Sequence, residues 1–269
     1  MRNLKIVICT RSMNYFLYKN ASQLMTLDFP KYRYTNTTAD GYIYQCIKTK
    51  ADIVINYDED AFLLNKKALL DLIEYVCDNN IACCGMPDGG VACRDHNPIV
   101  INPFFCIFNL IEIRKFYNMD EINNFAYEDH KEKLMDKFPM ELLTDYKRVR
   151  FDDTTFEPYY PFFLWLASNS QVFYLNSSVH ADGLSTILYN HLNEPFIIHT
   201  WYSREYGRDT YHTDRINDVI VECIRKRGLN LHVVNENVGV KCVEYYDRLS
   251  LQFWNFKRRI RRFIAKRIK

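Results

Sequence analysis

The chain has 269 residues, of which 48% are hydrophobic and 25% are charged. These values lie within the globular range, so they exclude long disorder and collagen-like repeats, and the length suffices for one large domain or two small ones. The net charge of +2 is unevenly distributed: residues 257–269 carry eight Lys and Arg and no acid, and the remainder has 27 basic against 33 acidic residues. The composition therefore describes an acidic body with a basic tail.

The first part of the chain alternates short apolar runs with segments of helical periodicity. The runs are rich in β-branched residues and bounded by polar ones, which is typical of buried strands. The expected strands are 4–9, 53–56 and 81–84, and the expected helices are 40–50, begun by Thr38 or Asp40, and 66–77, begun by Asn65. Such a βαβαβ alternation predicts a parallel sheet covered by helices.

After residue 98 the pattern is less regular. Strands are expected at 98–110, 172–175 and 195–198, and helices at 112–118, 158–168, 213–227 and 246–269, with a charged, helical surface segment at 119–150. No repeat and no Gly- or Pro-rich linker divides the sequence. We therefore predict an α/β fold with a mixed, mainly parallel sheet, formed by one domain over residues 1–245 and followed by a C-terminal amphipathic helix over 246–269.

The cysteines and the apolar runs indicate a compartment. The chain has nine cysteines, an odd number whose spacing suggests no disulfide ladder. The longest apolar stretch, 99–111, is interrupted by Asn102, Pro103 and Asn109, whereas a bilayer-spanning helix needs roughly 20 apolar residues. We expect a protein of the reducing cytoplasm, attached peripherally to the cytoplasmic face of a membrane.

An acidic triplet, Asp58-Glu59-Asp60, follows the second expected strand directly. In open α/β sheets, ligands bind at the carboxyl ends of the strands. Alternate residues after a strand can converge on one cation, and Mg²⁺ and Mn²⁺ prefer carboxylate oxygens. The sequence therefore predicts a divalent-metal site that uses Asp58 and Asp60, although an isolated D-x-D of this kind can also be a solvated acidic turn.

Residues 39–60, from Ala39-Asp40-Gly41-Tyr42 to Asp58-Glu59-Asp60, resemble the helix–strand–DxD segment of GT-A-fold glycosyltransferases of the family 2 type. The resemblance covers roughly residues 4–200. It implies a nucleotide-sugar donor, with Asp60 as a direct ligand of Mn²⁺ or Mg²⁺ and Asp58 on the metal or the ribose. It also implies that Thr10 and Arg11 lie beside the nucleotide and that Asp40 approaches the donor sugar.

The later acidic segment is similar to the catalytic region of the same family. Asp152-Asp153, Glu157, an apolar helix, a strand and His180 follow in the family's order. In inverting members an acidic residue there removes the acceptor proton, which implies Asp153 or Glu157 as the catalytic base. The alternative is that these carboxylates only cap the helix that follows. Because Pro158 favours the first helical position, we expect Glu157 at the N-terminus of that helix.

His199 ends the strand expected at 195–198, and an arginine-containing loop follows it. Several metal-dependent GT-A enzymes use a late histidine as a third metal ligand, and His199 is similar to it, with His180 as the competing candidate. A buried, hydrogen-bonded core histidine is the alternative. Arg204, in the loop 202–212, suits recognition of a diphosphate because guanidinium groups bind phosphate in a bidentate manner.

The C-terminal segment combines an apolar face with many cations. Its apolar residues recur at three- and four-residue steps, namely Phe253, Phe256, Ile260, Phe263, Ile264 and Ile268. Basic residues lie between them, which is typical of a helix that lies in an anionic membrane interface. Residues 253–269 are therefore expected to bind such a surface and not nucleic acid, and docking of the apolar face on the body is the other alternative.

The preferred hypothesis is a metal-dependent glycosyltransferase that acts on a glycan or glycolipid acceptor, such as a lipid-linked surface polysaccharide. The rival enzyme is a phosphatase of the haloacid dehalogenase type, which also has D-x-D at a strand end. That fold uses its first strand for the motif, whereas here a β-α unit precedes it. The non-enzymatic rival is a membrane-surface adaptor whose acidic triplet is incidental.

Overall fold

A computed structural model describes residues 4–89, 95–144, 146, 149–152, 157–234 and 238–267. Its large sheet has six strands in the order β2-β1-β3-β6-β5-β7. Their bounds are β1 Ile6–Arg11, β2 Lys31–Tyr34, β3 Ile53–Tyr57, β5 Cys83–Pro87, β6 Ile101–Asn109 and β7 Val172–Tyr174. All pairings are parallel except the two made by β6, so the expected mixed, mainly parallel sheet is confirmed.

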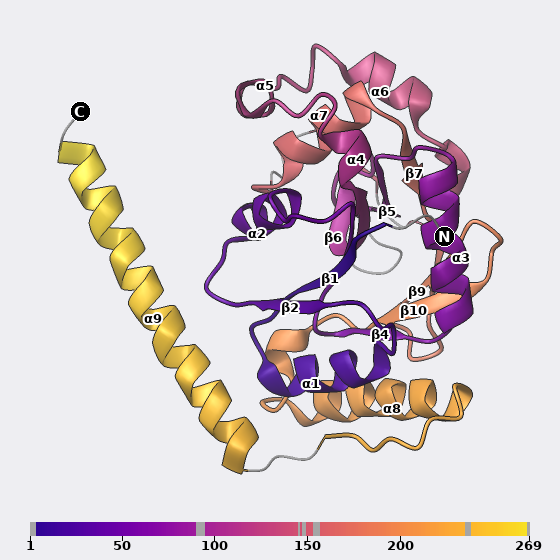
Figure 1. Ribbon diagram of the computed structural model, residues 1–269, viewed down its shortest axis with the longest axis vertical. Coiled ribbons are helices and arrows are strands. Elements are labelled where there is room, and N and C mark those ends of the chain that lie inside the picture. Colours follow the sequence, from indigo (N-terminus) through magenta and orange to yellow (C-terminus); the bar gives the residue numbers. More distant parts are fainter. Residues whose placement is uncertain are drawn as a thin grey trace.

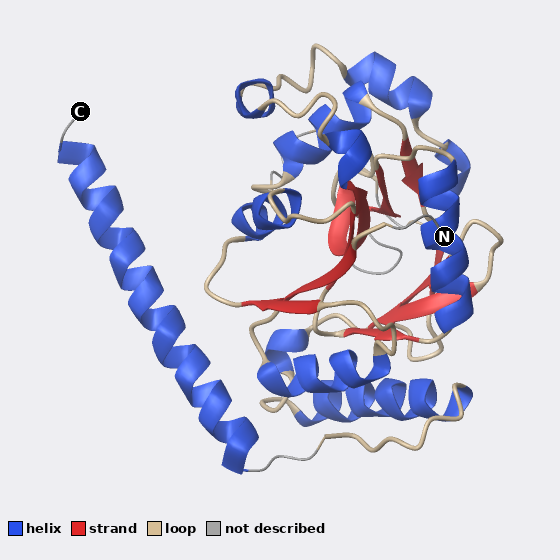
Figure 2. Ribbon diagram, viewed as in Figure 1, coloured by secondary structure: helices blue, strands red, loops and turns tan. Residues whose placement is uncertain are grey.

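Helices cover both faces of this sheet (Figures 1 and 2). Strand side chains alternate between the faces, so Ile6 and Ile8 join one hydrophobic cluster and Val7 and Cys9 join the other. The first cluster includes α1 Tyr15–Leu24, α3 Lys66–Asp78 and α8 Thr210–Lys226. The second includes α2 Ala39–Ile47, α4 Leu110–Ile113, α5 Met119–Asn123, α6 Lys131–Lys137 and α7 Tyr160–Asn169.

A second sheet, which the sequence pattern does not predict, packs into the first cluster. It is antiparallel, in the order β4-β10-β9-β8. Its strands are β4 Ala61–Leu63, β8 Ser177–Val179, β9 Thr186–Tyr189 and β10 Pro195–His199. The strand expected at 195–198 exists, but it belongs to this smaller sheet. Three of the four strands have only three or four residues, too few for an alternation to be read.

Helix boundaries agree with the expectations where the start signals are strong. The side chain of Asn65 accepts a hydrogen bond from the first turn of α3, as predicted. Of the two candidate starts of α2, Thr38 and Asp40, it is Thr38 whose side chain caps the helix. The segment 119–150 is less helical than expected: it holds α5, α6 and the 3₁₀ turn η1 Met140–Leu143. α7 begins at Tyr160 with Pro161 in its first turn, so Pro158 lies outside the helix, contrary to the prediction.

The terminal helix α9 has 30 residues, Val238–Arg267, and includes most of the segment expected to be helical. In Figure 1 its first turns lie beside α1 and its far end stands clear of the body. Over the described residues, none of the helices combines the length and the apolar character that crossing a bilayer would require.

A largely buried ion pair joins the second sheet to α8. Asp182, in the turn between β8 and β9, accepts hydrogen bonds from the backbone of Leu184 and Ser185 and from the Ser185 hydroxyl. Arg215 of α8 lies 3.0 Å from the same carboxylate and also donates to the backbone oxygen of Trp201. Partial burial opposes ionisation, but these donors prevail and lower the pKa of Asp182 well below its ordinary value.

Asp182→Asn is expected to lower the free energy of unfolding by about 2 kcal/mol at pH 7, because Arg215 loses its anionic partner in a mostly buried site. Because the native pKa is depressed, this contribution is full above the unfolded pKa of about 4 and declines as the pH falls toward the native pKa. Urea unfolding of both proteins from pH 7 to pH 3 measures it. A difference that stays constant down to pH 3 would contradict the assignment.

Candidate metal centre

The acidic triplet connects β3 of the large sheet to β4 of the small one. Asp58 follows β3, and β4 begins one residue after Asp60. The Asp58 N–H donates to the backbone oxygen of Phe104 at 2.7 Å, and the Ala61 N–H donates back to the Asp58 oxygen at 3.1 Å. Both carboxylates therefore lie at the carboxyl end of β3, where the sequence analysis placed them.

His199 is brought to the same place by strand pairing. β10 runs antiparallel to β4, with His199 opposite Ala61. The next residue, Thr200, donates from its N–H and from its hydroxyl to the backbone oxygen of Asp60, at 3.0 and 3.1 Å. The backbone of the histidine segment is thus fixed directly to the backbone of the acidic segment, although 140 residues separate them.

Asp58, Asp60 and His199 form a cluster whose candidate ligand atoms all lie within 4.8 Å of one another. Asp60 and His199 are each 3% exposed. His199 Nε2 lies 3.3 Å from Asp60 Oδ1, and its Nδ1 is buried with no hydrogen-bond partner. Two carboxylates and an imidazole whose Nε2 faces one of them fit a divalent cation, so these residues could bind a metal ion.

Two aromatic side chains hold the imidazole. Phe104 of β6 stacks on the His199 ring with a centroid distance of 4.0 Å and an interplanar angle of 6°, and Trp201 contacts it at 4.3 Å and 63°. Trp201 and Tyr202 both have positive φ, 56° and 60°, which is rare for large side chains. Such strain persists only where neighbours determine the backbone, and it often occurs at functional sites.

The charge of the cluster is poorly neutralised by the protein itself. Burial raises the pKa of Asp58 to about 7, the nearby Asp60 carboxylate adds to this effect, and His199 and Arg11 oppose it. The Nε of Arg11, the last residue of β1, is buried without a hydrogen-bond partner. A bound cation would offset the repulsion between the two carboxylates, as metal ions do in other carboxylate sites.

The middle residue of the triplet has a different role. Glu59 is 5% exposed, and its Oε2 accepts the backbone N–H groups of Met13 and Asn14 at 2.8 and 2.7 Å. This carboxylate therefore caps the turn between β1 and α1, while its two neighbours form the cluster. No local pattern indicated this long-range contact, although the alternation of side chains after a strand is consistent with it.

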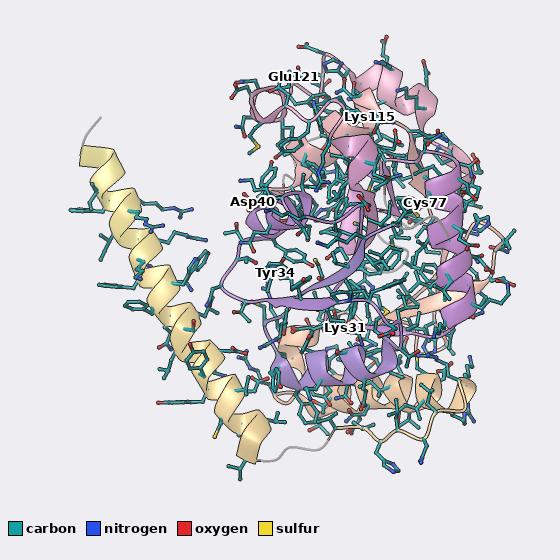
Figure 3. All side chains as sticks on the ribbon, in the orientation of Figure 1. Lys31, Tyr34, Asp40, Cys77, Lys115 and Glu121 are labelled. Atoms are coloured by element: carbon teal, nitrogen blue, oxygen red, sulfur yellow. The ribbon has the colours of Figure 1, made fainter. Side chains whose placement is uncertain are left out.

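The other predicted site residues lie in various places. Thr10 is buried at the end of β1, next to Arg11, and Asp40 lies in the first turn of α2, where Figure 3 labels it. Arg204 is exposed in the 3₁₀ turn η2, Ser203–Glu205. Glu157 lies three residues before α7, and its backbone oxygen accepts the N–H of Tyr160. Asp153 lies outside the described residues.

The competing histidine belongs to a different group of side chains. His180 Nε2 lies 3.0 Å from Glu222 of α8, and its Nδ1 accepts the Asp182 N–H at 3.2 Å. Both ring nitrogens are thus engaged in the contact between the second sheet and α8. Of the two histidines considered from the sequence, His199 is the one that lies with Asp58 and Asp60.

Comparison with protein-family models finds no match, and comparison with curated proteins finds none either. Among solved structures, one similar chain is titled "Crystal Structure of A197 from STIV". The TM-score is 0.35 at 8% identity, over 71% of this chain and 93% of that one. A similarity at this level carries no argument about activity, so the function is argued from the residues of the site.

Mn²⁺ is expected to raise the melting temperature of the wild-type protein by roughly 5 °C at a hundred times its Kd, because a ligand of the native state alone stabilises it by mass action. Asp60→Asn should abolish this shift. Glu59→Gln is the matched control: it removes a carboxylate one residue away that is already occupied by backbone N–H groups, and it should keep the shift. Differential scanning fluorimetry measures the melting temperatures. If both variants lose the Mn²⁺ shift equally, the assignment of the metal site to Asp60 is contradicted.

Proposed function

We propose that this protein is a metal-dependent glycosyltransferase of the GT-A type, which transfers a sugar from a nucleotide-sugar to a hydroxyl group of a glycan or glycolipid. The observation that carries the proposal is the Asp58/Asp60/His199 cluster at the carboxyl end of β3. The adjacent parallel strand β1 ends at the same edge with Thr10 and Arg11. Two carboxylates with a histidine, beside an arginine at a strand edge, suit a cation together with a diphosphate.

In this proposal Asp58, Asp60 and His199 would hold Mn²⁺ or Mg²⁺, which would supply charge neutralisation for the departing diphosphate. Arg11 lies close enough to Asp58 to lower its pKa, and it adds a second positive charge at that edge. Thr10 and Asp40 contact the nucleotide and the donor sugar. Arg204, exposed on η2 five residues after His199, is proposed to contact the diphosphate as well.

At the anomeric carbon the reaction breaks one bond and forms one. The acceptor oxygen attacks the anomeric carbon, the bond from that carbon to the diphosphate oxygen breaks, and the nucleoside diphosphate leaves with the electron pair. The hydroxyl proton passes to a carboxylate, Glu157 or Asp153, if the configuration inverts. The proposed setting is the cytoplasmic membrane face, with a lipid-linked glycan as acceptor.

The donor is tested by thermal shift with a panel of nucleoside diphosphates, each with and without Mn²⁺. One nucleotide is expected to add a further shift that requires Mn²⁺ and is absent in Asp60→Asn and His199→Ala, while Glu59→Gln keeps it. A Mn²⁺ shift with no further effect of any nucleotide would contradict the transferase. Metal-dependent release of phosphate from p-nitrophenyl phosphate, also lost in Asp60→Asn, would favour the phosphatase instead.

The catalytic base is tested with Glu157→Gln and Asp153→Asn, once the donor is known. One of the two variants should lose at least about 100-fold in kcat for sugar transfer and keep the shift with Mn²⁺ and nucleotide, because general-base catalysis contributes roughly 10²–10⁴. If both variants keep wild-type kcat, neither residue is the base. If a variant loses both kcat and the thermal shift with Mn²⁺ and nucleotide, the residue contributes to donor binding.

A further inference from the structure

The helix α9 meets the body through polar contacts along its first half. The Phe16 N–H donates to Glu244, and Asn36 donates to the Ser250 hydroxyl at 2.6 Å. Arg33 of β2 forms an ion pair with Asp247 at 2.5 Å, and both side chains are only about one-sixth exposed. Glu244, Asp247 and Ser250 recur at three-residue steps, so they share one face of the helix. α9 therefore turns a polar face toward the body.

The opposite face is apolar and exposed. Six residues at three- and four-residue steps form what we call the apolar stripe, with exposed fractions from 42% to 59%: Leu249, Phe253, Phe256, Ile260, Phe263 and Ile264. Successive residues of an α-helix are rotated by roughly 100° about its axis. On this basis the six side chains span an arc of about 100°, and the centre of that arc faces away from Glu244 and Asp247. The body-contacting face and the apolar stripe therefore lie on opposite sides of α9. Docking of the stripe on the body, one alternative left by the sequence, is not what the structure has.

Basic side chains accompany the distal part of the stripe. Lys257, Arg258, Arg259, Arg261 and Arg262 occupy its flanks and the face behind it, and no acidic residue follows Asp247. The Lys257 ammonium lies 4.4 Å from the centre of the Phe253 ring, and the Arg258 guanidinium lies 5.1 Å from that of Trp254. Long basic side chains beside an apolar face can keep their charges in a headgroup layer while the face is buried.

We infer that α9 lies on an anionic lipid surface, with the apolar stripe inserted and the basic side chains among the headgroups. A second copy of the helix fits less well, because two segments with many cations and no acid after Asp247 repel each other. Nucleic acid would satisfy the cations but leave the stripe in water. A bilayer with anionic lipids satisfies both features at once. The inference rests on α9 alone and holds whether or not the proposed sugar transfer is correct.

The attachment points place this surface with respect to the metal centre. Arg33 is in β2 and Asn36 follows it, and β2 pairs in parallel with β1, which ends at Arg11. α9 is therefore fastened at the edge of the large sheet to which the carboxyl ends of its parallel strands point. In Figure 3 the distal part of the helix lies clear of the body, so its side chains are accessible to a surface.

The test uses the full chain and flotation with vesicles. Binding to vesicles of equimolar phosphatidylcholine and phosphatidylglycerol is expected to be at least ten-fold tighter than to phosphatidylcholine alone, and to weaken as salt is raised. A stripe variant, Phe256→Ser with Ile260→Ser and Phe263→Ser, should bind the anionic vesicles at least ten-fold more weakly than the wild type. The matched control is Tyr211→Ser with Val221→Ser, which removes exposed apolar side chains from α8 and should bind like the wild type.

Other outcomes would overturn the inference. A second variant combines Arg258→Gln, Arg259→Gln, Arg261→Gln and Arg262→Gln. If this variant loses vesicle binding but the stripe variant binds normally, the attraction is electrostatic adsorption without insertion. Tighter binding to a single-stranded RNA than to anionic vesicles would assign the helix to nucleic acid. The wild type could instead fail to bind vesicles and form a dimer in sedimentation equilibrium. If the stripe variant loses that dimer, the apolar stripe binds a second copy of the chain. The thermal melting transition, expected to be the same in all variants, verifies that each one is folded.

Discussion

The pairing of β4 with β10 is the contact on which the candidate site depends. β4 has three residues, yet it turns the chain out of the large sheet directly after the acidic triplet. Its partner strand ends at His199, and Thr200 fixes that end to the Asp60 backbone with two hydrogen bonds. Without this short ladder the carboxylates would remain at the edge of β3, but no imidazole would face them. The cluster is thus a product of two sheets that meet at one loop.

A few residues make several of the hydrogen bonds and ring contacts that position the site. Phe104 bonds to the start of the acidic loop through its backbone oxygen and stacks on His199 through its ring. Arg215 donates to the backbone of Trp201, whose ring contacts both the imidazole and the Phe104 ring. The ion pair of Arg215 with Asp182 therefore stabilises the second sheet and also restrains the strained turn after His199. Fold stability and site geometry share the same interactions here.

The sequence predicted the parts of the fold whose signals are local. β1, β3, α3 and the two cap residues Thr38 and Asn65 follow from apolar runs and start signals, and the D-x-D at a strand end led to the correct edge of the sheet. β2 was missed because Lys31–Tyr34 is an edge strand that alternates basic and aromatic side chains and is partly exposed. The second sheet was missed because its strands are short and pair over long separations.

The candidate site shows the same division between local and long-range information. Asp58 and Asp60 could be chosen from spacing, but the choice of His199 over His180 requires the β4–β10 register, which no local pattern encodes. Glu59 looked equivalent to its neighbours until its contact with the backbone of Met13 and Asn14 was known. The outward direction of the apolar stripe on α9 was also hidden, because periodicity defines a face of a helix but not what the face meets.

Protein contacts alone hold His199 in position. Its backbone is fixed by a strand ladder and its ring by Phe104 and Trp201, and the loop that carries Asp58 and Asp60 is fixed by backbone hydrogen bonds. None of these contacts involves a metal ion, so the ligands are arranged in advance of binding. Such a centre differs from a zinc finger, in which the ion organises the polypeptide. A cation bound by these residues would therefore be exchangeable, and a chelator should remove it reversibly while the fold persists.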